Sequence, residues 1–490
     1  MKYSLDSLPF SNSFARLPDA YYARVAPTPF EAPARLLHFN TRVAEQLGLD
    51  PVVQHDPRFL AAFSGRQLLP DMEPIAMLYA GHQFGHYVRQ LGDGRAILLG
   101  EIRTARGERW ELQLKGSGQT PYSRAGDGRA VLRSSIREYL AGEALHGLGI
   151  PSTRALCLVG ADDEVYREQI ETGAMITRVA PSHVRFGSFE VFYYRNQIEP
   201  IKHLADYVIA RYYPDLKNLA DPYPEFLRQV ALRTADLMAQ WQAVGFSHGV
   251  MNTDNMSILG LTLDYGPFGF LDAFDPGFVC NHSDTGGRYA FDQQPDVAAW
   301  NITKLAQALV PLMSVETASQ AISEYPQVFG RAYLERMAAK FGLPPGSETA
   351  ALVMDALQLL AQNHIDYTIF MRRLCSFDSR PEALNAPLRD LFLDRVAFDA
   401  WAVRYAAALR RLGSVDGERA AAMRRVNPKY ILRNHLAEVA IRSAADARDY
   451  SEVNRLHRLL MRPFDEQPEN EAYAAEPPDW ARKIEVSCSS

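Results

Sequence analysis

The sequence predicts an α+β protein in which a small mixed region precedes a large helical region. Apolar and polar residues alternate strictly from Trp110 to Lys115, which is the two-residue period of a β-strand. Apolar residues recur every four positions from Leu132 to Leu148, as in an amphipathic helix. From residue 296 to 465 almost every segment has helical periodicity. We therefore expect strands mainly before residue 180 and a helical layer after it.

Length and composition define the organisation of the chain. Its 490 residues correspond to roughly three structural units at about 150 residues each. With 47% hydrophobic and 22% charged residues the composition is that of a folded globular protein, which excludes wholesale disorder or a coiled coil. We predict four segments: an N-terminal extension that wraps the core (1–75), a small mixed α/β lobe (76–180), a mainly helical lobe (181–465) and a C-terminal tail (466–490).

The mixed lobe contains turn and strand signals in a clear order. Leu91-Gly92-Asp93-Gly94-Arg95 predicts a glycine-bearing turn, and the apolar run 96–99 predicts the strand that follows it. In strand 110–115 the apolar side chains are expected to face the core, and Lys115 lies with the other polar side chains on the opposite face. This pattern predicts a half-buried strand.

Two long helices come next. The first covers 132–148 and stops where Gly149 ends the pattern. The second runs from about 224 to 244, with Gly245 as its C-cap. It leads into a loop that ends near residue 258, after which we expect a short apolar strand before Asp264-Tyr265-Gly266.

Charge and targeting signals exclude several classes of protein. The chain has 52 basic and 58 acidic residues, a formal charge of -6 and a pI of about 6.1, so no global positive field exists to bind nucleic acid or an anionic membrane. No run reaches the about 18 apolar residues that a membrane-spanning helix needs, and the N-terminus has no secretory core. Four scattered cysteines are too few for a disulfide framework. We expect a soluble, cytoplasmic monomer.

The order of the elements matches a protein-kinase-like fold with two lobes. A glycine turn and two strands end at Lys115, a helix with an internal Glu138 follows, and a loop with Asn255 precedes Asp264. An ion pair between Lys115 and Glu138 could hold the lysine on phosphate oxygens. Asn255 and Asp264 offer two hard oxygen ligands that suit Mg²⁺ bound together with the phosphates of a nucleotide.

One position departs from the kinase pattern. Kinase catalytic loops place a proton-accepting Asp two residues after the His, but in His248-Gly249-Val250 that position is occupied by Val250. A valine cannot accept a proton, so the usual phosphoryl transfer is disfavoured. The chain is then either a pseudokinase that only binds, or a catalyst that uses the site differently. Asp254 is the one nearby carboxylate of the loop.

At these residues the chain resembles the selenoprotein O family, the SelO/YdiU protein adenylyltransferases. The resemblance spans some 420 residues and rests on the runs Asn12-Ser13-Phe14-Ala15-Arg16-Leu17-Pro18, Tyr79-Ala80-Gly81-His82-Gln83-Phe84-Gly85, Leu112-Gln113-Leu114-Lys115-Gly116-Ser117-Gly118, Thr120-Pro121-Tyr122-Ser123-Arg124, Gly249-Val250-Met251-Asn252-Thr253-Asp254-Asn255-Met256 and Asn427-Pro428-Lys429-Tyr430-Ile431-Leu432-Arg433-Asn434.

The resemblance implies a pseudokinase fold that binds ATP end for end relative to a kinase, with the γ-phosphate buried. It implies transfer of AMP from ATP to a Ser, Thr or Tyr hydroxyl of a protein substrate, with release of pyrophosphate and with Mg²⁺ or Mn²⁺ as cofactor. Asp254 matches the family's proposed proton acceptor, Asn255 and Asp264 match its metal ligands, and Glu138 matches the partner of the lysine. The positions that match its nucleotide-binding residues are Gly92, Gly94, Arg95, Lys115, Asp127, Gly128, Arg178, Arg185 and Asp264.

Three other functions remain open at this point. UMP transfer from UTP is one, because phosphate contacts do not select a base. A kinase with a relocated base and a nucleotide-binding scaffold without catalysis are the others. Labelled ATP separates them, since the label must lie at the α-phosphate for AMP transfer and at the γ-phosphate for a kinase.

Two cysteines suggest redox regulation. In eukaryotic relatives the position of Cys488, third from the end, is selenocysteine, so the resemblance implies a redox role for it. Cys280 lies where the activation segment of a kinase would be. Either a reversible Cys280–Cys488 disulfide ties the tail over the site and gates access, or both thiols are unpaired.

Overall fold

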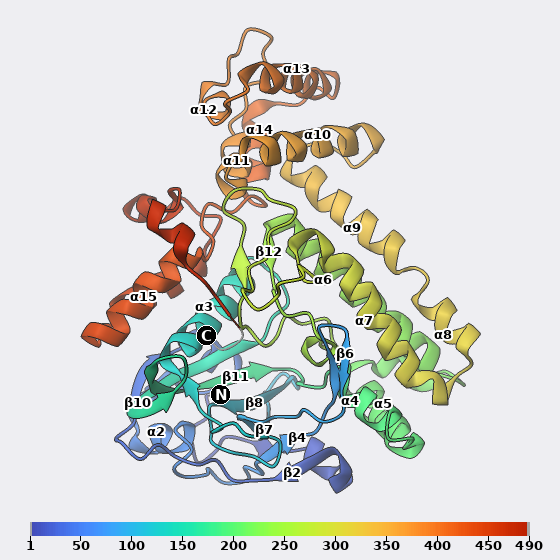
Figure 1. Ribbon diagram of the computed structural model, residues 1–490, viewed down its shortest axis with the longest axis vertical. Coiled ribbons are helices and arrows are strands. Elements are labelled where there is room, and N and C mark those ends of the chain that lie inside the picture. Colours follow the sequence, from blue (N-terminus) through green and yellow to red (C-terminus); the bar gives the residue numbers. More distant parts are fainter. Residues whose placement is uncertain (1, 488–490) are drawn as a thin grey trace.

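In the computed structural model, which describes residues 2–487, nine strands from the first 180 residues form one antiparallel sheet (Figure 1). Its order is β2-β4-β7-β8-β11-β10-β3, with β1 paired to β7 and β9 paired to β11. The bounds are β1 Phe10–Ser11, β2 Tyr22–Arg24, β3 Arg35–Phe39, β4 Ile75–Met77, β7 Ala96–Arg103, β8 Arg109–Lys115, β9 Ala130–Val131, β10 Arg154–Tyr166 and β11 Ile170–Ala180. The segment 1–75, expected to wrap the core, thus also supplies strands to the sheet.

Two short two-stranded sheets stand outside this sheet. The strand β5 (Gly81–Gln83) pairs with β6 (His86–Val88), and β12 (Phe246–Ser247) pairs with β13 (Gly269–Phe270). The remaining segments are mostly helical. Their bounds are α1 Thr41–Gln46, α2 Pro57–Phe63, α3 Leu132–Gly147, α4 Gly187–Tyr193, α5 Ile198–Tyr212, α6 Tyr223–Val244, α7 Gln294–Leu309, α8 Val315–Ile322, α9 Tyr325–Lys340, α10 Ser347–Asn363, α11 Tyr367–Leu374, α12 Ala386–Arg389, α13 Arg395–Arg411, α14 Asp416–Arg424, α15 Asn434–Ala447 and α16 Ser451–Leu460.

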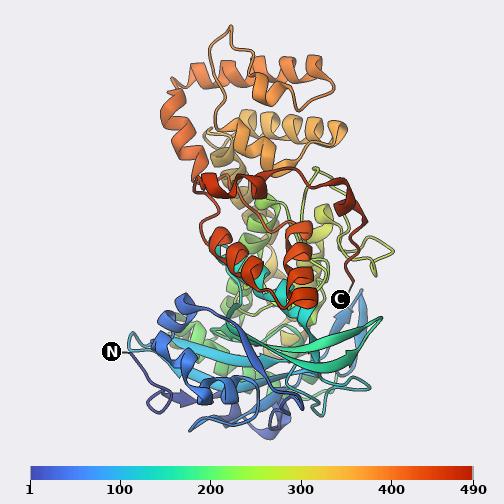
Figure 2. The same ribbon diagram turned by 90° about the vertical axis from the view of Figure 1, so that its left-hand side faces the viewer.

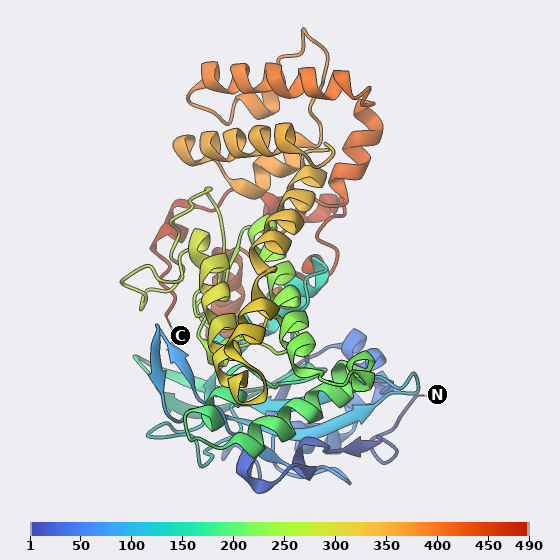
Figure 3. The same cartoon turned by 90° about the vertical axis from the view of Figure 1, so that its right-hand side faces the viewer.

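The sheet and the distal helices lie at opposite ends of the molecule. Figure 2 shows the strands at one end and α10 to α14 at the other. In Figure 3 the long helices α6, α7 and α9 run between these ends. The predicted mixed α+β chain with a large helical portion is confirmed. Across residues 2–487 we find no helix with the length and apolarity needed to span a lipid bilayer.

The two long predicted helices are present where the apolar spacing placed them. Helix α3 spans Leu132–Gly147 and α6 spans Tyr223–Val244. Both end at glycines in the left-handed region, Gly149 at φ 79° and Gly245 at φ 73°, where a side chain would be strained. The predicted helical content after residue 296 is also confirmed by α7 to α16.

Two local predictions were wrong. Strand β8 is not half-buried, because Gln113 and Lys115 on its polar face are as buried as Leu112 and Leu114. The apolar side chains pack with α1 and α2, whereas the polar face is covered by the helical side of the molecule. The expected strand before Asp264 is absent as well. The chain turns at Gly260, and only isolated β-bridges form there, from Ser257 to Arg185 and from Thr262 to Ser152.

Candidate active site

A cavity of about 710 Å³ lies between the sheet and the loop 250–267. Its wall includes the glycine turn, the end of β8 and the segment 122–129. All the residues predicted to bind a nucleotide, a metal or a proton line it, namely Gly92, Gly94, Arg95, Lys115, Asp127, Gly128, Arg178, Arg185, Asp254, Asn255 and Asp264. The structure therefore brings the predicted residues together, and only Glu138 lies behind the wall.

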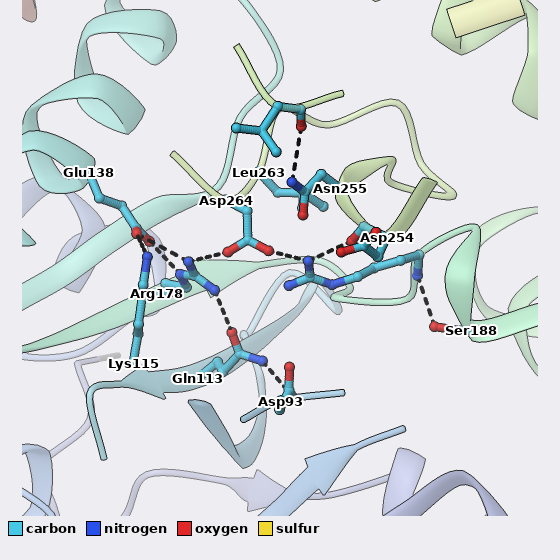
Figure 4. A network of polar contacts seen from close by, with 12 residues as sticks. Asp93, Gln113, Lys115, Glu138, Arg178, Ser188, Asp254, Asn255, Leu263 and Asp264 are labelled. Atoms are coloured by element: carbon cyan, nitrogen blue, oxygen red, sulfur yellow. Dashed lines mark hydrogen bonds and ion pairs between the residues drawn. The ribbon is translucent and has the colours of Figure 1, made fainter. Parts of the chain in front are cut away.

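Lys115 and Glu138 form a buried ion pair at the base of this cavity (Figure 4). Lys115 ends β8, and Glu138 stands in the middle of α3, which packs beside β10 and β11. Burial lowers the pKa of Lys115 to about 8, although Glu138 acts in the opposite direction. The ammonium group therefore depends on its carboxylate partner to stay charged.

Arg178 on β11 connects this pair to Asp264. Its Nη2 lies 3.1 Å from Glu138 Oε2 and 2.5 Å from Asp264 Oδ1, and its Nη1 donates to Gln113 Oε1 at 3.1 Å. Arg185 bonds the other Asp264 oxygen and donates from Nη1 to the Asp254 carbonyl oxygen at 2.7 Å. The result is a continuous network of alternating cations and carboxylates along the cavity (Figure 4).

Burial opposes ionisation of Glu138 and Asp264, but the neighbouring cations stabilise the two carboxylates more strongly than burial penalises them. Arg178 and Lys115 keep the pKa of Glu138 below its ordinary value, and Arg178 and Arg185 hold the pKa of Asp264 well below its usual range. Asp264 also has a φ of 60°, a left-handed conformation that Asp tolerates better than most residues. Its carboxylate is thus fixed and ionised.

Asp254 differs from these paired carboxylates. It accepts from Gln83 Nε2 at 3.2 Å through Oδ2, whereas its buried Oδ1 has no hydrogen-bond partner among the described residues. Burial raises the pKa of Asp254 to about 7, against the opposing charge of Arg185. Asp254 lines the cavity, and a carboxylate with an uncommitted oxygen and a raised pKa can take a proton from a hydroxyl group that reaches it.

The glycine turn is held by the segment 120–123. Thr120 Oγ1 donates to the Asp93 carbonyl oxygen at 2.6 Å, and Ser123 Oγ donates to the Gly94 carbonyl. Gly92 has φ 109°, and a Cβ there would lie 2.7 Å from the ring of Tyr122. Packing against this segment is therefore sufficient to require glycine at position 92.

Arg95, Asp127 and Gly128 line the outer part of the cavity. Asp127 accepts from Arg167 at 2.7 Å and 3.0 Å and from the Arg129 backbone at 2.9 Å. Gly128 has φ 71°, and a Cβ there would lie 2.1 Å from Gly118. Arg95 forms no ion pair within residues 2–487, and burial lowers its pKa. It is a cation without a carboxylate partner in the wall.

A sequence model of the family described as "Protein adenylyltransferase SelO" matches residues 4–461. The chain belongs to the SelO family. The protein nucleotidyltransferase YdiU of Thiobacillus denitrificans is 76% identical over 487 residues, covering 99% of this chain and 100% of the relative. The protein of the same name from Myxococcus xanthus is 55% identical over 488 residues, with 99% and 100% covered, and that from Thioalkalivibrio sulfidiphilus is 56% identical over 495 residues, with both chains covered completely. The predicted family and enzyme class are confirmed.

Asn255 and Asp264 fit the divalent cation expected for a SelO nucleotidyltransferase. Asn255 donates from Nδ2 to the Val250 carbonyl oxygen at 3.0 Å, which leaves its amide oxygen available. Asp264 bonds two arginines, but a carboxylate has lone pairs for more than two partners. No group of three or more His, Cys, Asp and Glu side chains in residues 2–487 is arranged to hold a metal. Two oxygens suit Mg²⁺, which takes its other ligands from phosphates and water.

Sequence reasoning missed two residues that support Arg178. Asp93, interpreted as a turn residue, accepts at Oδ2 from Met77 N and from Gln113 Nε2, both at 3.1 Å. Gln113, expected on an open face, accepts from Arg178 at Oε1 and so links Asp93 to Arg178. The alternation of side chains along β8 could have identified Gln113, because it places Gln113 on the same face of the strand as Lys115. Tyr79, Gln83 and Phe84 also line the cavity, within a run on which the resemblance was based.

Of the two cysteines considered for redox regulation, Cys280 lies among the described residues. Cys280 is buried, donates from Sγ to the Pro267 carbonyl oxygen at 2.7 Å, and has its pKa raised to about 12 by burial. Such a thiol is a weak nucleophile at neutral pH. Cys488 lies outside the described residues. The tail does pass close by, because His282 N donates to the Val486 carbonyl oxygen at 2.9 Å.

Proposed function

We propose that this member of the SelO family transfers AMP from ATP to Ser, Thr or Tyr hydroxyls of other proteins and releases pyrophosphate. The observation that carries the proposal is the unpartnered Oδ1 of Asp254 beside a locally cationic cavity. Among the described residues the wall contains seven Lys and Arg side chains against four Asp side chains, although the whole chain is acidic. This local excess of positive charge favours a triphosphate.

The reaction assigns a role to each group. The hydroxyl oxygen forms a bond with the α-phosphorus, the bond between the α-phosphate and the β-phosphate breaks, and its electron pair leaves with pyrophosphate. Asp254 takes the hydroxyl proton. Lys115, Arg178 and Arg185 stabilise the negative charge that builds up on the phosphates, because they lie buried where charge interactions are strong. A divalent cation held by Asn255 and Asp264 would add further stabilisation of this charge.

We further propose a pseudokinase fold in which ATP is bound with its γ-phosphate buried. Val250 lines the cavity where a kinase would place its catalytic acid, so no carboxylate is available at that point to serve an acceptor beside the γ-phosphate. Asp254 is the carboxylate that remains to take the proton of the acceptor hydroxyl, and we place that hydroxyl beside the α-phosphate. The Lys115–Glu138 pair supports the kinase-like part of the proposal.

The test is intact-mass measurement after incubation with ATP and Mg²⁺ or Mn²⁺. We expect the protein or an added acceptor to gain one adenylate, with label from α-labelled ATP and none from γ-labelled ATP. Lys115→Ala and Asp264→Asn should abolish the gain, whereas Lys217→Ala, an exposed control outside the cavity, should retain it. Label from γ-labelled ATP alone would identify a kinase, and binding without any label would identify a scaffold. A parallel incubation with UTP measures which nucleotide is transferred.

We also propose that oxidation links Cys280 to Cys488 and restricts access to the site. The support is the path of the tail, since Val486 is bonded beside His282, two residues from Cys280. Each thiol loses a proton and an electron to an oxidant such as oxidised glutathione. Thiol counting should give two fewer free thiols after oxidation, and Cys280→Ser should remove this difference. An equal count in both states would refute the disulfide.

A further inference from the structure

An aromatic and basic surface lies beside the mouth of the cavity. We call it the rim surface and define it by Tyr87 on β6, Tyr194 at the end of α4, Arg195, Arg288, and Trp300 and Lys304 on α7. In Figure 1 the hairpin β5–β6 rises from the sheet toward α7. No residue of this surface was predicted from the sequence to act in the reaction.

The rings of the rim surface form one connected group. Tyr87 and Tyr194 lie with their ring centroids 3.8 Å apart, and His82 contacts both Tyr87 and Trp300 with centroids 5.3 Å apart. Tyr194 is 39% exposed, and Tyr87 and Trp300 are partly exposed. A partner can therefore reach this aromatic group from solvent.

The same hairpin also holds the loop that contains Asp254. His82 N donates to Thr253 Oγ1 at 2.7 Å, and Gln83 Nε2 donates to Asp254 Oδ2 at 3.2 Å. Gln83 and Phe84 line the cavity, whereas Tyr87 is partly exposed and lies outside the cavity wall. The rim surface thus continues directly from the carboxylate that is proposed to receive the acceptor hydroxyl.

The charges of the rim surface are positive and unpaired. The guanidinium of Arg288 lies 4.7 Å from the centre of the Trp300 ring, and the Lys304 ammonium lies 4.9 Å from it. Arg195 donates to the neutral side chain of Gln90 at 3.1 Å. In the part of the chain that the structure describes, none of these three cations forms a salt bridge. Unpaired cations around exposed aromatic rings complement acidic segments that contain an apolar or aromatic residue.

We propose that the rim surface docks the acceptor protein and selects hydroxyl residues flanked by acidic side chains. The purpose of this docking rests on the proposed AMP transfer. Its test measures binding and does not depend on that transfer. Acidic groups of the acceptor contact Arg195, Arg288 and Lys304, and an aromatic or apolar residue lies against Tyr194. The hydroxyl can then pass Gln83 and reach Asp254.

Binding of a fluorescent random copolymer of glutamate and tyrosine tests the proposal by anisotropy, which requires no catalysis. The variant R195E/K304E should bind it about tenfold more weakly than the wild type, because two attractions become repulsions. Arg288 is left in place since its guanidinium packs against Gly85. The matched control R106E/K217E changes the net charge equally at two exposed positions without ion pairs in the described residues, and should bind like the wild type.

The outcomes separate the surface from the reaction. Equal affinity of R195E/K304E and R106E/K217E, at equal melting temperatures, would overturn the rim surface even if AMP transfer is observed. Equal competition by single-stranded DNA of matched charge would also overturn it, since the surface would then bind any polyanion. Weakened binding in R195E/K304E alone supports the rim surface. A failure of AMP transfer with every acceptor would refute the proposed function and leave this binding result standing.

Discussion

Replacing Glu138 with Gln tests whether the buried ion pair positions Lys115 for catalysis. Glu138 is 4% exposed and contacts both Lys115 and Arg178. Arg178 keeps Asp264 as a second carboxylate, but Lys115 has no other ion-pair partner within residues 2–487. The substitution therefore leaves one buried ammonium uncompensated and presents an amide group to it.

The expected effect on stability follows from this burial. Breaking a buried ion pair costs about 3–5 kcal/mol, and because Arg178 stays paired we expect the lower end, about 3 kcal/mol. At about 2.1 cal/mol/K per residue the unfolding entropy of 490 residues is about 1 kcal/mol/K, so the melting temperature falls by about 3 °C. Catalysis should fall further, since a misplaced Lys115 costs about a hundredfold in kcat.

Glu143 provides a matched control on the same helix. It is fully buried and bonds Arg154 at 2.6 Å and 2.7 Å, outside the cavity. Although burial opposes it, contacts with His457 and Arg154 lower the pKa of Glu143 to about 2. Against an ordinary value of 4.5 this corresponds to about 3 kcal/mol, present above pH 4.5 and lost toward pH 2. Glu143→Gln should therefore destabilise the fold as much as Glu138→Gln.

The assay combines thermal melts with AMP transfer from α-labelled ATP at temperatures where both variants are folded. Glu138→Gln should lose about a hundredfold in kcat, while Glu143→Gln retains the wild-type kcat per folded molecule. If both variants lost activity by the same factor, the effect would be a general consequence of weakening α3. Wild-type kcat in Glu138→Gln would refute the positioning role outright.

Three further predictions concern single residues. Asp254→Asn should keep ATP affinity by calorimetry but lower kcat by at least about a hundredfold, and retained turnover would exclude Asp254 as proton acceptor. Arg95→Ala should weaken ATP binding about tenfold without changing the melting temperature, because no ion pair within the described residues is broken; unchanged affinity would place Arg95 outside the nucleotide site. Burial, assisted by His457, lowers the pKa of His38 to about 3 from 6.5, so its stabilisation is complete above pH 6.5 and falls on acidification, by about 2 kcal/mol at pH 5. Melts between pH 7 and 5 should show a shallower decline in His38→Gln, and parallel curves would contradict this assignment.

The sequence predicts well those elements whose signals are local. The bounds of α3 and α6 follow from apolar spacing and from Gly149 and Gly245, which end the helices whatever surrounds them. The strands β1 and β3 carry no comparable signal. They are short, and their partners β7 and β10 lie about a hundred residues away, so pairing depends on contacts that local composition does not encode.

The buried polar face of β8 was missed for a similar reason. Alternation reports which side chains share a face, but not whether that face meets water or a second layer. Gln113 and Lys115 are covered because α3 and Arg178 supply partners for them, and these come from other parts of the chain. Polar residues on a strand therefore become informative about a site only when their partners are known.

The candidate residues were predicted singly, but their charges act as one network. Asp264 holds Arg178 and Arg185, and Glu138 holds Lys115 and Arg178, so the three central cations share two carboxylates. A ligand that occupies an oxygen of Asp264 competes with one of the two guanidinium groups and frees it to face the cavity. Arg178 would still be held by Glu138, whereas Arg185 would keep no carboxylate partner, only its bond to the Asp254 carbonyl oxygen and its contact with the Tyr79 ring at 4.8 Å. Of these three cations Arg185 is therefore the best placed to move onto a phosphate, and it would do so next to the carboxylate proposed to accept the proton.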